Sequence, residues 1–232
     1  MFKKKSKTLQ NNKRKLITKT KSKSPISEQY RTIRTNIQFA AVDQEMQIIM
    51  VTSATPGEGK STTASNLAVV MAQQGKKVLL LDADLRKPTV HYTFNQTNTL
   101  GLTNVLMKKI KLSEAVKSTD VDYLSVLTSG PIPPNPAELL GSKMMNELFG
   151  KLRNEFETVI IDTPPLLAVA DAQIVANSCD GTVLVISSGK TEIEDAQKAT
   201  DMLKASSSTL LGVVINNKKI TGDSGYYYYY GN

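Results

Sequence analysis

Six short apolar runs, read as strands, constrain the fold of this chain most strongly. The clearest are Val78–Asp82 (VLLLD) and Thr158–Asp162 (TVIID), in which polar residues do not alternate with apolar ones. Continuous apolar strands are typical of a parallel sheet that helices cover on both faces. We therefore predict an α/β domain with a mostly parallel sheet. The other strands are expected at residues 47–52, 123–127, 181–186 and 211–216.

Helical patterns fill the segments between these runs, as the connections of a parallel sheet require. Ser27 is a good N-cap for a helix that runs to about residue 42, with Ile33 and Ile37 on its apolar side. The remaining helices are expected at residues 61–74, 101–107, 112–117, 136–153, 170–178 and 191–206.

The net charge of +8 is concentrated at the N-terminus. Residues 1–25 hold ten Lys and Arg and no Asp or Glu, so the other 207 residues hold 19 basic and 21 acidic side chains, a balance of −2. A basic segment of this kind predicts a disordered arm over residues 1–25, followed by a domain over 26–218 and a flexible tail over 219–232. The arm is a solvated tail, or it binds an anionic membrane surface or an acidic partner. Nucleic acid is not expected, because few aromatic residues accompany the charge.

Several classes of protein are disfavoured by simple counts. The chain has one cysteine, Cys179, and one histidine, His91, which rules out an internal disulfide and makes a zinc site improbable. It has no apolar stretch long enough to span a membrane and no signal peptide, so we expect a cytoplasmic protein.

A glycine-rich loop at residues 54–61 (ATPGEGKS) lies between a predicted strand and a predicted helix. This is the context of a phosphate-binding loop, in which Gly57 and Gly59 let backbone N–H groups face an anion. The usual G-x-x-x-x-G-K-[ST] pattern is broken at its first position by Ala54. The alternative is a chance Gly-Lys-Ser turn.

The residues that end this loop predict a nucleotide site. Lys60 is expected to contact the β- and γ-phosphates, Ser61 to ligate Mg²⁺, and Thr62 to reach the α-phosphate.

Three aspartates end predicted strands near the loop. Asp82 and Asp84 follow one strand and Asp162 ends another, and open α/β sheets bind ligands at the carboxyl ends of their strands. Asp84 and Asp162 are expected to hold the metal and its waters, and Asp82 to act as a base and also as a metal ligand. The alternative is that Asp82 and Asp84 cap the next turn.

Five consecutive tyrosines near the C-terminus are expected to accept phosphate, because a phosphoryl-transfer site accompanies them. The alternative is an aromatic tail that docks on a partner. The five residues are Tyr226, Tyr227, Tyr228, Tyr229 and Tyr230.

The segments ATPGEGKS, LLLDADLRKP, VIIDTPP and GPIPPNPAELL together resemble the deviant-Walker P-loop ATPases. They are more similar still to the bacterial tyrosine kinases that regulate capsular and exopolysaccharide synthesis. The resemblance implies a P-loop NTPase-like fold and an adenine contact at Asn216. It also implies an ATP–Mg²⁺ site built from Gly57, Glu58, Gly59, Lys60, Ser61, Thr62, Asp82, Asp84 and Asp162.

The same resemblance implies partners. Glu28, Arg31 and Arg34 match an oligomerisation motif, so a ring-like homo-oligomer is expected, with each tail in a neighbour's site. From the residues alone, ordinary surface pairing at this helical spacing is an equal alternative. A membrane-embedded activator, a polysaccharide co-polymerase on a separate chain, would recruit the protein to the inner face of the membrane, and a tyrosine phosphatase and further protein substrates are expected.

The predicted function is transfer of the ATP γ-phosphoryl group to tyrosines. One rival is an ATPase switch related to the partition proteins, whose tail is only a docking element. Those proteins carry a lysine where this chain has Thr55, which weakens that alternative. The other rival is a non-enzymatic adaptor.

Overall fold

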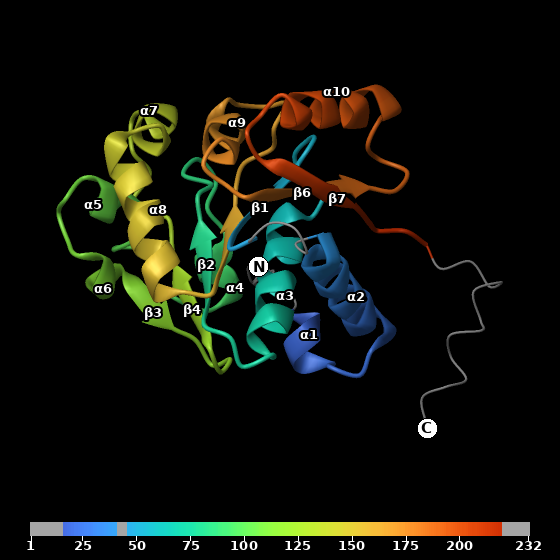
Figure 1. Ribbon diagram of the computed structural model, residues 1–232, viewed down its shortest axis with the longest axis horizontal. Helices are drawn as coiled ribbons and strands as arrows, with labels where there is room; N and C mark the ends of the chain where they lie inside the picture. The colour runs from blue at the N-terminus through green and yellow to red at the C-terminus, as the bar shows by residue number, and fades with distance from the viewer. Residues whose placement is uncertain (1–15, 41–45, 220–232) are drawn as a thin grey trace, which may run out of the picture.

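A computed structural model of the chain describes residues 16–40 and 46–219 (Figure 1). Its centre is one seven-stranded sheet in the order β3-β4-β2-β5-β1-β6-β7. Every neighbouring pair is parallel except β3 with β4, so the predicted mostly parallel sheet is confirmed. The strands are β1 Ile48–Ser53, β2 Val78–Asp82, β3 Val116–Ser118, β4 Leu124–Leu127, β5 Thr158–Asp162, β6 Gly181–Ser187 and β7 Thr209–Asn216.

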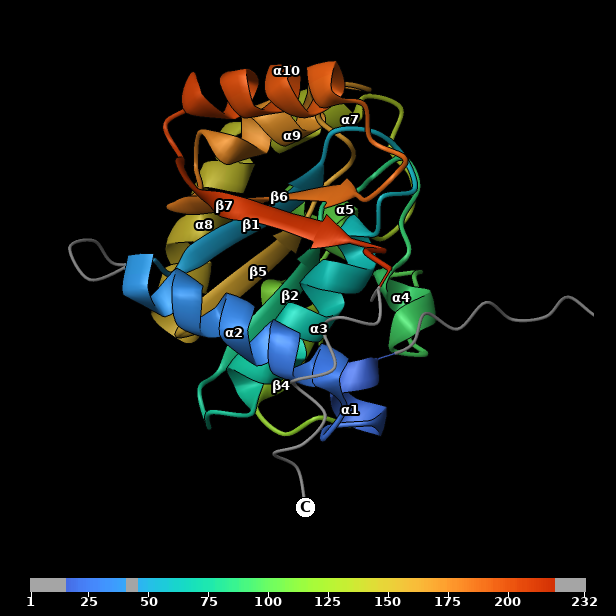
Figure 2. The ribbon, with the colours of Figure 1, turned by 90° about the vertical axis from the view of Figure 1, so that its right-hand side faces the viewer.

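Helices cover both faces of the sheet, as Figure 2 shows. One hydrophobic cluster lies between the sheet and α1, α2 and α3, and the other lies beneath α5 to α10. Strands β1, β2 and β5 are buried along their whole length, which explains the continuous apolar runs in their sequences. The helices are α1 Ile17–Thr20, α2 Pro25–Ala40, α3 Lys60–Ala72, α4 Val90–Thr93, α5 Leu102–Leu106, α6 Leu112–Ala115, α7 Pro136–Leu140, α8 Lys143–Glu155, α9 Asp171–Ala176 and α10 Ile193–Lys204.

Three predicted helices differ from the observed ones. The prediction of Ser27 as an N-cap is wrong, because α2 begins at Pro25, and the Ser27 N–H instead donates to the hydroxyl of the preceding Ser24 at 3.2 Å. The helix expected at residues 112–117 ends at Ala115, and the chain continues as the short antiparallel strand β3. The helix expected at residues 136–153 is two helices, because Ser142 interrupts it and caps α8 by accepting a hydrogen bond from the Met145 N–H at 3.4 Å.

The predicted disordered arm is wrong for residues 16–25. Leu16 and Thr18 are buried, and α1 packs on α3, the helix that follows the glycine-rich loop. The Thr18 N–H and hydroxyl both donate to Asn66 Oδ1, at 3.1 and 2.9 Å. A count of charged residues cannot predict this contact, because the residues that are buried, Leu16 and Thr18, carry no charge. Residues 1–15 lie outside the described part of the chain.

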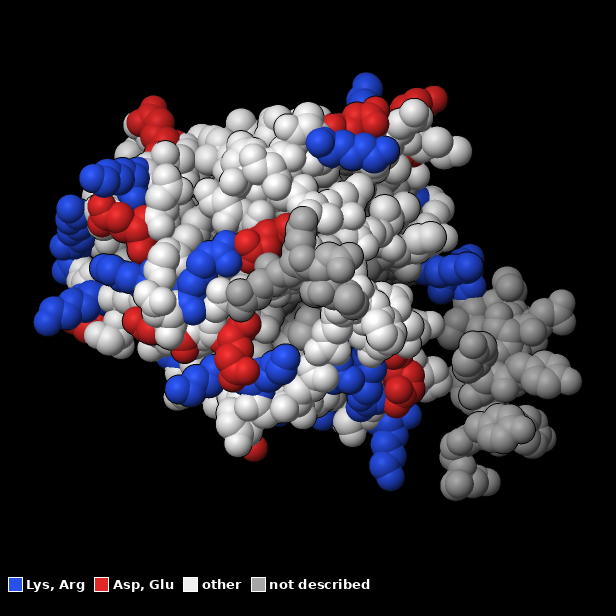
Figure 3. All heavy atoms as spheres, viewed as in Figure 1, with Lys and Arg blue, Asp and Glu red and all other residues white. Residues whose placement is uncertain are grey.

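Charges of both signs are mixed on the face that Figure 3 shows, with basic side chains most frequent at the end that carries α5, α6 and α8. This mixture matches the near-neutral body expected from the charge count. Among the described residues, no helix is long and apolar enough to cross the membrane.

Replacement of Asn66 tests the docking of α1. Asn66→Ala removes the acceptor of both Thr18 hydrogen bonds and is expected to lower the free energy of unfolding by about 1–3 kcal/mol. Urea unfolding measures this loss, and trypsin should cleave faster after Lys19, Lys21 and Lys23. Thr18→Val keeps the backbone bond to Asn66 and should show a smaller loss. Unchanged stability and cleavage in Asn66→Ala would show that α1 does not depend on this contact.

Candidate functional site

The strand order places the candidate residues at one edge of the sheet. The glycine-rich loop follows β1, Asp82 ends β2 and Asp162 ends β5, and these three strands are neighbours in the order β2-β5-β1. Asp82 and Asp162 are paired positions in the parallel register. The chain therefore gathers side chains that are up to about 100 residues apart in sequence.

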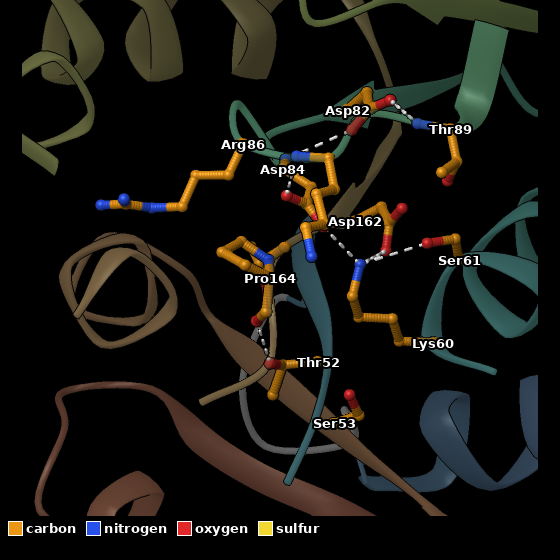
Figure 4. Close-up of polar contacts among 12 residues, drawn as sticks. Thr52, Ser53, Lys60, Ser61, Asp82, Asp84, Arg86, Thr89, Asp162 and Pro164 are labelled. Atoms are coloured by element: carbon orange, nitrogen blue, oxygen red, sulfur yellow. Dashed lines mark hydrogen bonds and ion pairs between the residues drawn. The ribbon is translucent and has the colours of Figure 1, made fainter. Parts of the chain in front are cut away.

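Lys60, the first residue of α3, lies at the centre of the site (Figure 4). Its Nζ atom donates to Asp84 Oδ2 at 2.8 Å, to the Ser61 hydroxyl at 3.2 Å and to Asp162 Oδ1 at 3.5 Å. Burial by itself would lower the pKa of Lys60, but the negative charges of Asp162 and Asp84 outweigh it and raise the pKa above its usual value. Lys60 therefore carries a positive charge among buried carboxylates.

Asp82 is fully buried and held by backbone amides. Its Oδ1 accepts from the Asp84 N–H at 3.2 Å, and its Oδ2 accepts from the N–H groups of Thr89 and Val90 at 3.1 and 3.0 Å. Burial, with the nearby charge of Asp162, raises the pKa of Asp82 from 3.8 to about 7. Asp82 thus caps the following turn, as one alternative held, and it is also a carboxylate of unusually high basicity.

The glycine-rich loop has a backbone that requires its glycines. Gly57 and Gly59 have φ values of +81° and +98°. Residues other than glycine rarely adopt such a backbone conformation. A Cβ atom at Gly59 would lie 2.0 Å from Asn216 Nδ2. Asn216 ends β7 and donates to the Glu58 carbonyl at 2.9 Å. The residue expected near adenine is thus in contact with the loop.

Glu58 has a structural role in this loop that the sequence analysis missed. Its side chain is fully buried and accepts hydrogen bonds from the Thr55 N–H at 2.8 Å and the Thr55 hydroxyl at 3.0 Å. The Thr191 hydroxyl, from the connection between β6 and α10, donates to the same carboxylate. Lys190 Nζ donates to the Pro56 carbonyl at 3.0 Å. The connection between β6 and α10 is therefore attached to the loop at two points.

Arg86 lies in the loop after β2, two residues beyond Asp84. It forms a two-point contact with Asp171, the first residue of α9, at 2.9 Å from both Nε and Nη2. Asp171 is fully buried, and this contact raises the pKa of Arg86. The contact ties the loop after β2 to α9.

The three α2 residues of the expected oligomerisation motif make contacts within the chain. Arg31 pairs with Glu28 and donates to the Ser22 carbonyl at 2.7 Å. Arg34 donates to the Val70 carbonyl on α3 at 2.8 Å. Glu28 and Arg31 therefore form the ordinary surface ion pair that was the alternative to an oligomer contact. The five tyrosines at 226–230 lie outside the described residues.

The oxygen atoms around Lys60 show whether the predicted ligands could hold Mg²⁺. Across residues 16–40 and 46–219, no three His, Cys, Asp or Glu side chains are grouped so that they could hold a metal ion alone. Ser61, Asp84 and Asp162, however, direct one oxygen each at the Lys60 ammonium, so they already surround a cation. Mg²⁺ in nucleotide sites uses one or two carboxylates together with phosphate and water oxygens. The residues present fit that mode of binding.

Comparison with known proteins places the chain among characterised families. The ParA family model, described as NUBPL iron-transfer P-loop NTPase, matches residues 44–227. The chain is 63% identical over 201 residues to the tyrosine-protein kinase YwqD of Bacillus subtilis, covering 87% of this chain and 85% of that protein. It is 42% identical to the putative tyrosine-protein kinase CapB of Staphylococcus aureus, covering 84% and 85%. The crystal structure of the chimerical protein CapA2B2 superposes with a TM-score of 0.86 at 44% identity, covering 88% of this chain and 90% of that one.

A double-mutant cycle tests the contact between Glu58 and Thr191. Glu58→Gln and Thr191→Val should each lower the free energy of unfolding by about 1–2 kcal/mol, because each leaves a buried polar group without its partner. Their effects should fall short of additivity by at least about 0.5 kcal/mol, measured by urea unfolding. Thr200→Val is the control, because the Thr200 hydroxyl donates to the Ala196 carbonyl of its own helix. The loss from Thr200→Val should add fully to the loss from Glu58→Gln. Full additivity for Thr191→Val would contradict the coupling.

Proposed function

The chain belongs to the bacterial tyrosine-protein kinases, a branch of the P-loop NTPases, and on that premise we propose that it transfers the γ-phosphoryl group of ATP to its own C-terminal tyrosines. The observation that carries the proposal is the position of the Lys60 ammonium between Asp84 and Asp162, beside a buried Asp82. Phosphoryl transfer depends mainly on positioning and on neutralising charge, and these residues supply both.

ATP binding is assigned to the loop and to the start of α3. The backbone N–H groups of Gly57, Glu58 and Gly59 and the N-terminal end of α3 favour an anion. Lys60 contacts the β- and γ-phosphates, and Thr62 contacts the α-phosphate. The adenine contact of Asn216 is supported by its hydrogen bond to the loop at the Glu58 carbonyl.

Mg²⁺ would be held by Ser61, Asp84 and Asp162, whose oxygens already face a cation. When bound, the metal ion neutralises charge on the phosphate oxygens. Asp82 is a less suitable ligand than expected, because its two oxygens accept three backbone N–H groups. We therefore assign to Asp82 the role of general base, which accepts the proton of the acceptor tyrosine.

The acceptor tyrosine gives its phenolic proton to Asp82. In the transfer, the phenolic oxygen forms a bond to the γ-phosphorus, the bond from that phosphorus to the β–γ bridging oxygen breaks, and ADP leaves. A phenol has a pKa near 10, so an ordinary aspartate is a poor base for it. The raised pKa of Asp82, about 7, narrows this gap.

The proposed phosphate acceptors are the tail tyrosines from Tyr226 to Tyr230. The transfer takes place within one chain or between neighbouring subunits of a homo-oligomeric ring. Glu28, Arg31 and Arg34 lie on one helix and are the residues proposed for the contact between subunits. Each phosphate adds nearly two negative charges. Repeated phosphorylation would therefore repel the tail from the acidic site and open the assembly.

The wider role proposed is regulation of capsular or exopolysaccharide synthesis, supported by the resemblance to CapB. A membrane-embedded activator on a separate chain would recruit the kinase to the inner face of the membrane, and a tyrosine phosphatase would reverse the modification. Other proteins can serve as further substrates.

Replacement of Lys60 tests the assignment of the site. Lys60→Met removes the cation that faces the phosphates, so no phosphate should be incorporated when the variant is incubated with Mg-ATP and membranes of the source cell. Intact-mass spectrometry measures the incorporation, and circular dichroism checks the fold. Lys87→Met is the matched control and should retain most activity. Incorporation at the wild-type level in Lys60→Met would contradict the assignment.

Replacement of the tail tyrosines tests the acceptors. With Tyr226, Tyr227, Tyr228, Tyr229 and Tyr230 all changed to Phe, most autophosphorylation should disappear while ATP binding remains. Mass spectrometry of tail peptides locates the phosphate. Tyr92→Phe and Tyr123→Phe, at two exposed tyrosines, are controls that should change little. Phosphate found mainly on Tyr92 or Tyr123 would contradict the tail assignment, and ATP hydrolysis without any gain in mass would favour an ATPase switch.

A further inference from the structure

Lys190, an exposed residue in the connection between β6 and α10, is the second lysine whose ammonium lies on the glycine-rich loop. We propose that Lys190 contacts the phosphate groups of the bound nucleoside triphosphate and acts there as a second cation beside Lys60. This inference rests on the proposed function, since it needs nucleotide phosphates in the loop.

The position of Lys190 is fixed by its neighbours in sequence. The Thr191 hydroxyl donates to the buried Glu58 carboxylate and accepts from the Ser187 N–H at 2.8 Å. The backbone of the connection is therefore attached to the loop one residue from Lys190. A long flexible side chain that starts from an attached backbone is confined to the surface of that loop.

The Lys190 ammonium lies beside Gly57, which has no side chain. Its Nζ donates to the Pro56 carbonyl at 3.0 Å, and a Cβ atom at Gly57 would lie 2.8 Å from it. An ammonium has three N–H donors. Within the described residues Pro56 is its one acceptor, so two N–H groups remain for phosphate oxygens beside Gly57.

Lys60 ends the loop, whereas Lys190 reaches the loop from the neighbouring strand β6. The loop follows β1, which lies between β5 and β6. Lys60 points toward the carboxylates at the ends of β2 and β5, whereas Lys190 comes from the end of β6. Phosphates bound in this loop would have a cation available on each side.

The charges of the site indicate why a second cation matters. Asp82, Asp84 and Asp162 bring three carboxylates to the site, against the single ammonium of Lys60. Arg86 is held by the buried Asp171 through two hydrogen bonds, so its charge is already matched. A polyphosphate that enters an acidic site is stabilised by each cation that touches it, and lysine binds phosphate as a point charge.

The alternative role for Lys190 is only to brace the loop through Pro56. The two roles differ in what they need, because bracing needs an N–H donor while phosphate contact needs positive charge. Lys190→Gln keeps an N–H donor and removes the charge, and Lys190→Arg keeps both. Lys198→Gln, at an exposed lysine of α10, controls for the loss of one positive charge from the chain.

The experiment is titration of the full chain with ATP in the presence of Mg²⁺, by calorimetry. Lys190→Gln should bind ATP about tenfold more weakly, as expected for one hydrogen bond to a charged group. Lys190→Arg should stay within about threefold of the wild type, and Lys198→Gln should match it.

Three outcomes would overturn the inference. Equal ATP affinity in the wild type and in Lys190→Gln would show that the charge does not touch phosphate. Equal losses in Lys190→Gln and Lys190→Arg would show that affinity follows the shape of the side chain and not its positive charge. A wild-type chain that binds no ATP would remove the proposed function together with this inference, whereas the first two outcomes leave the proposed function intact.

Discussion

Buried negative charge at two paired strand ends is the constraint on which the site depends. Asp82 and Asp162 stand opposite each other in the register of β2 and β5, and both are fully buried. Unpaired charges in such a place cost several kcal/mol each, so they require compensation nearby. Backbone amides compensate Asp82, and the Lys60 ammonium compensates Asp162 and Asp84. The parallel sheet has to be mostly complete before these groups meet, which couples the site to the fold.

Much of this architecture was predictable because it depends on local patterns. The apolar runs ending in Asp82 and Asp162 and the loop before Lys60 each carry their own signal, and a parallel sheet brings the ends of its strands to one edge. The short strand β3 was not predictable, since its three residues, Val116–Ser118, are partly exposed and have no strong pattern of their own.

The contacts that sequence reasoning missed join residues far apart in the chain. Glu58 meets Thr191 across 133 positions, and Arg86 meets Asp171 across 85. Nothing in the segment around Glu58 or Arg86 indicates the partner, because the pairing follows from which strands become neighbours. The burial of Thr18 against Asn66 is of the same kind and explains why charge alone wrongly assigned residues 16–25 to a disordered arm.

Asn216 ends β7 and contacts the glycine-rich loop, so the segment that follows it in the sequence starts beside that loop. Tyr226 is ten positions after Asn216, and a segment of that length extends to at most about 33–36 Å. In the proposed function, phenols joined to the chain over such a length would meet their own loop at an effective concentration on the order of millimolar. If the tail tyrosines accept phosphate as proposed, another protein substrate would have to compete with acceptors carried on the same chain. A force applied to the C-terminus would act on β7, whose last residue contacts the loop.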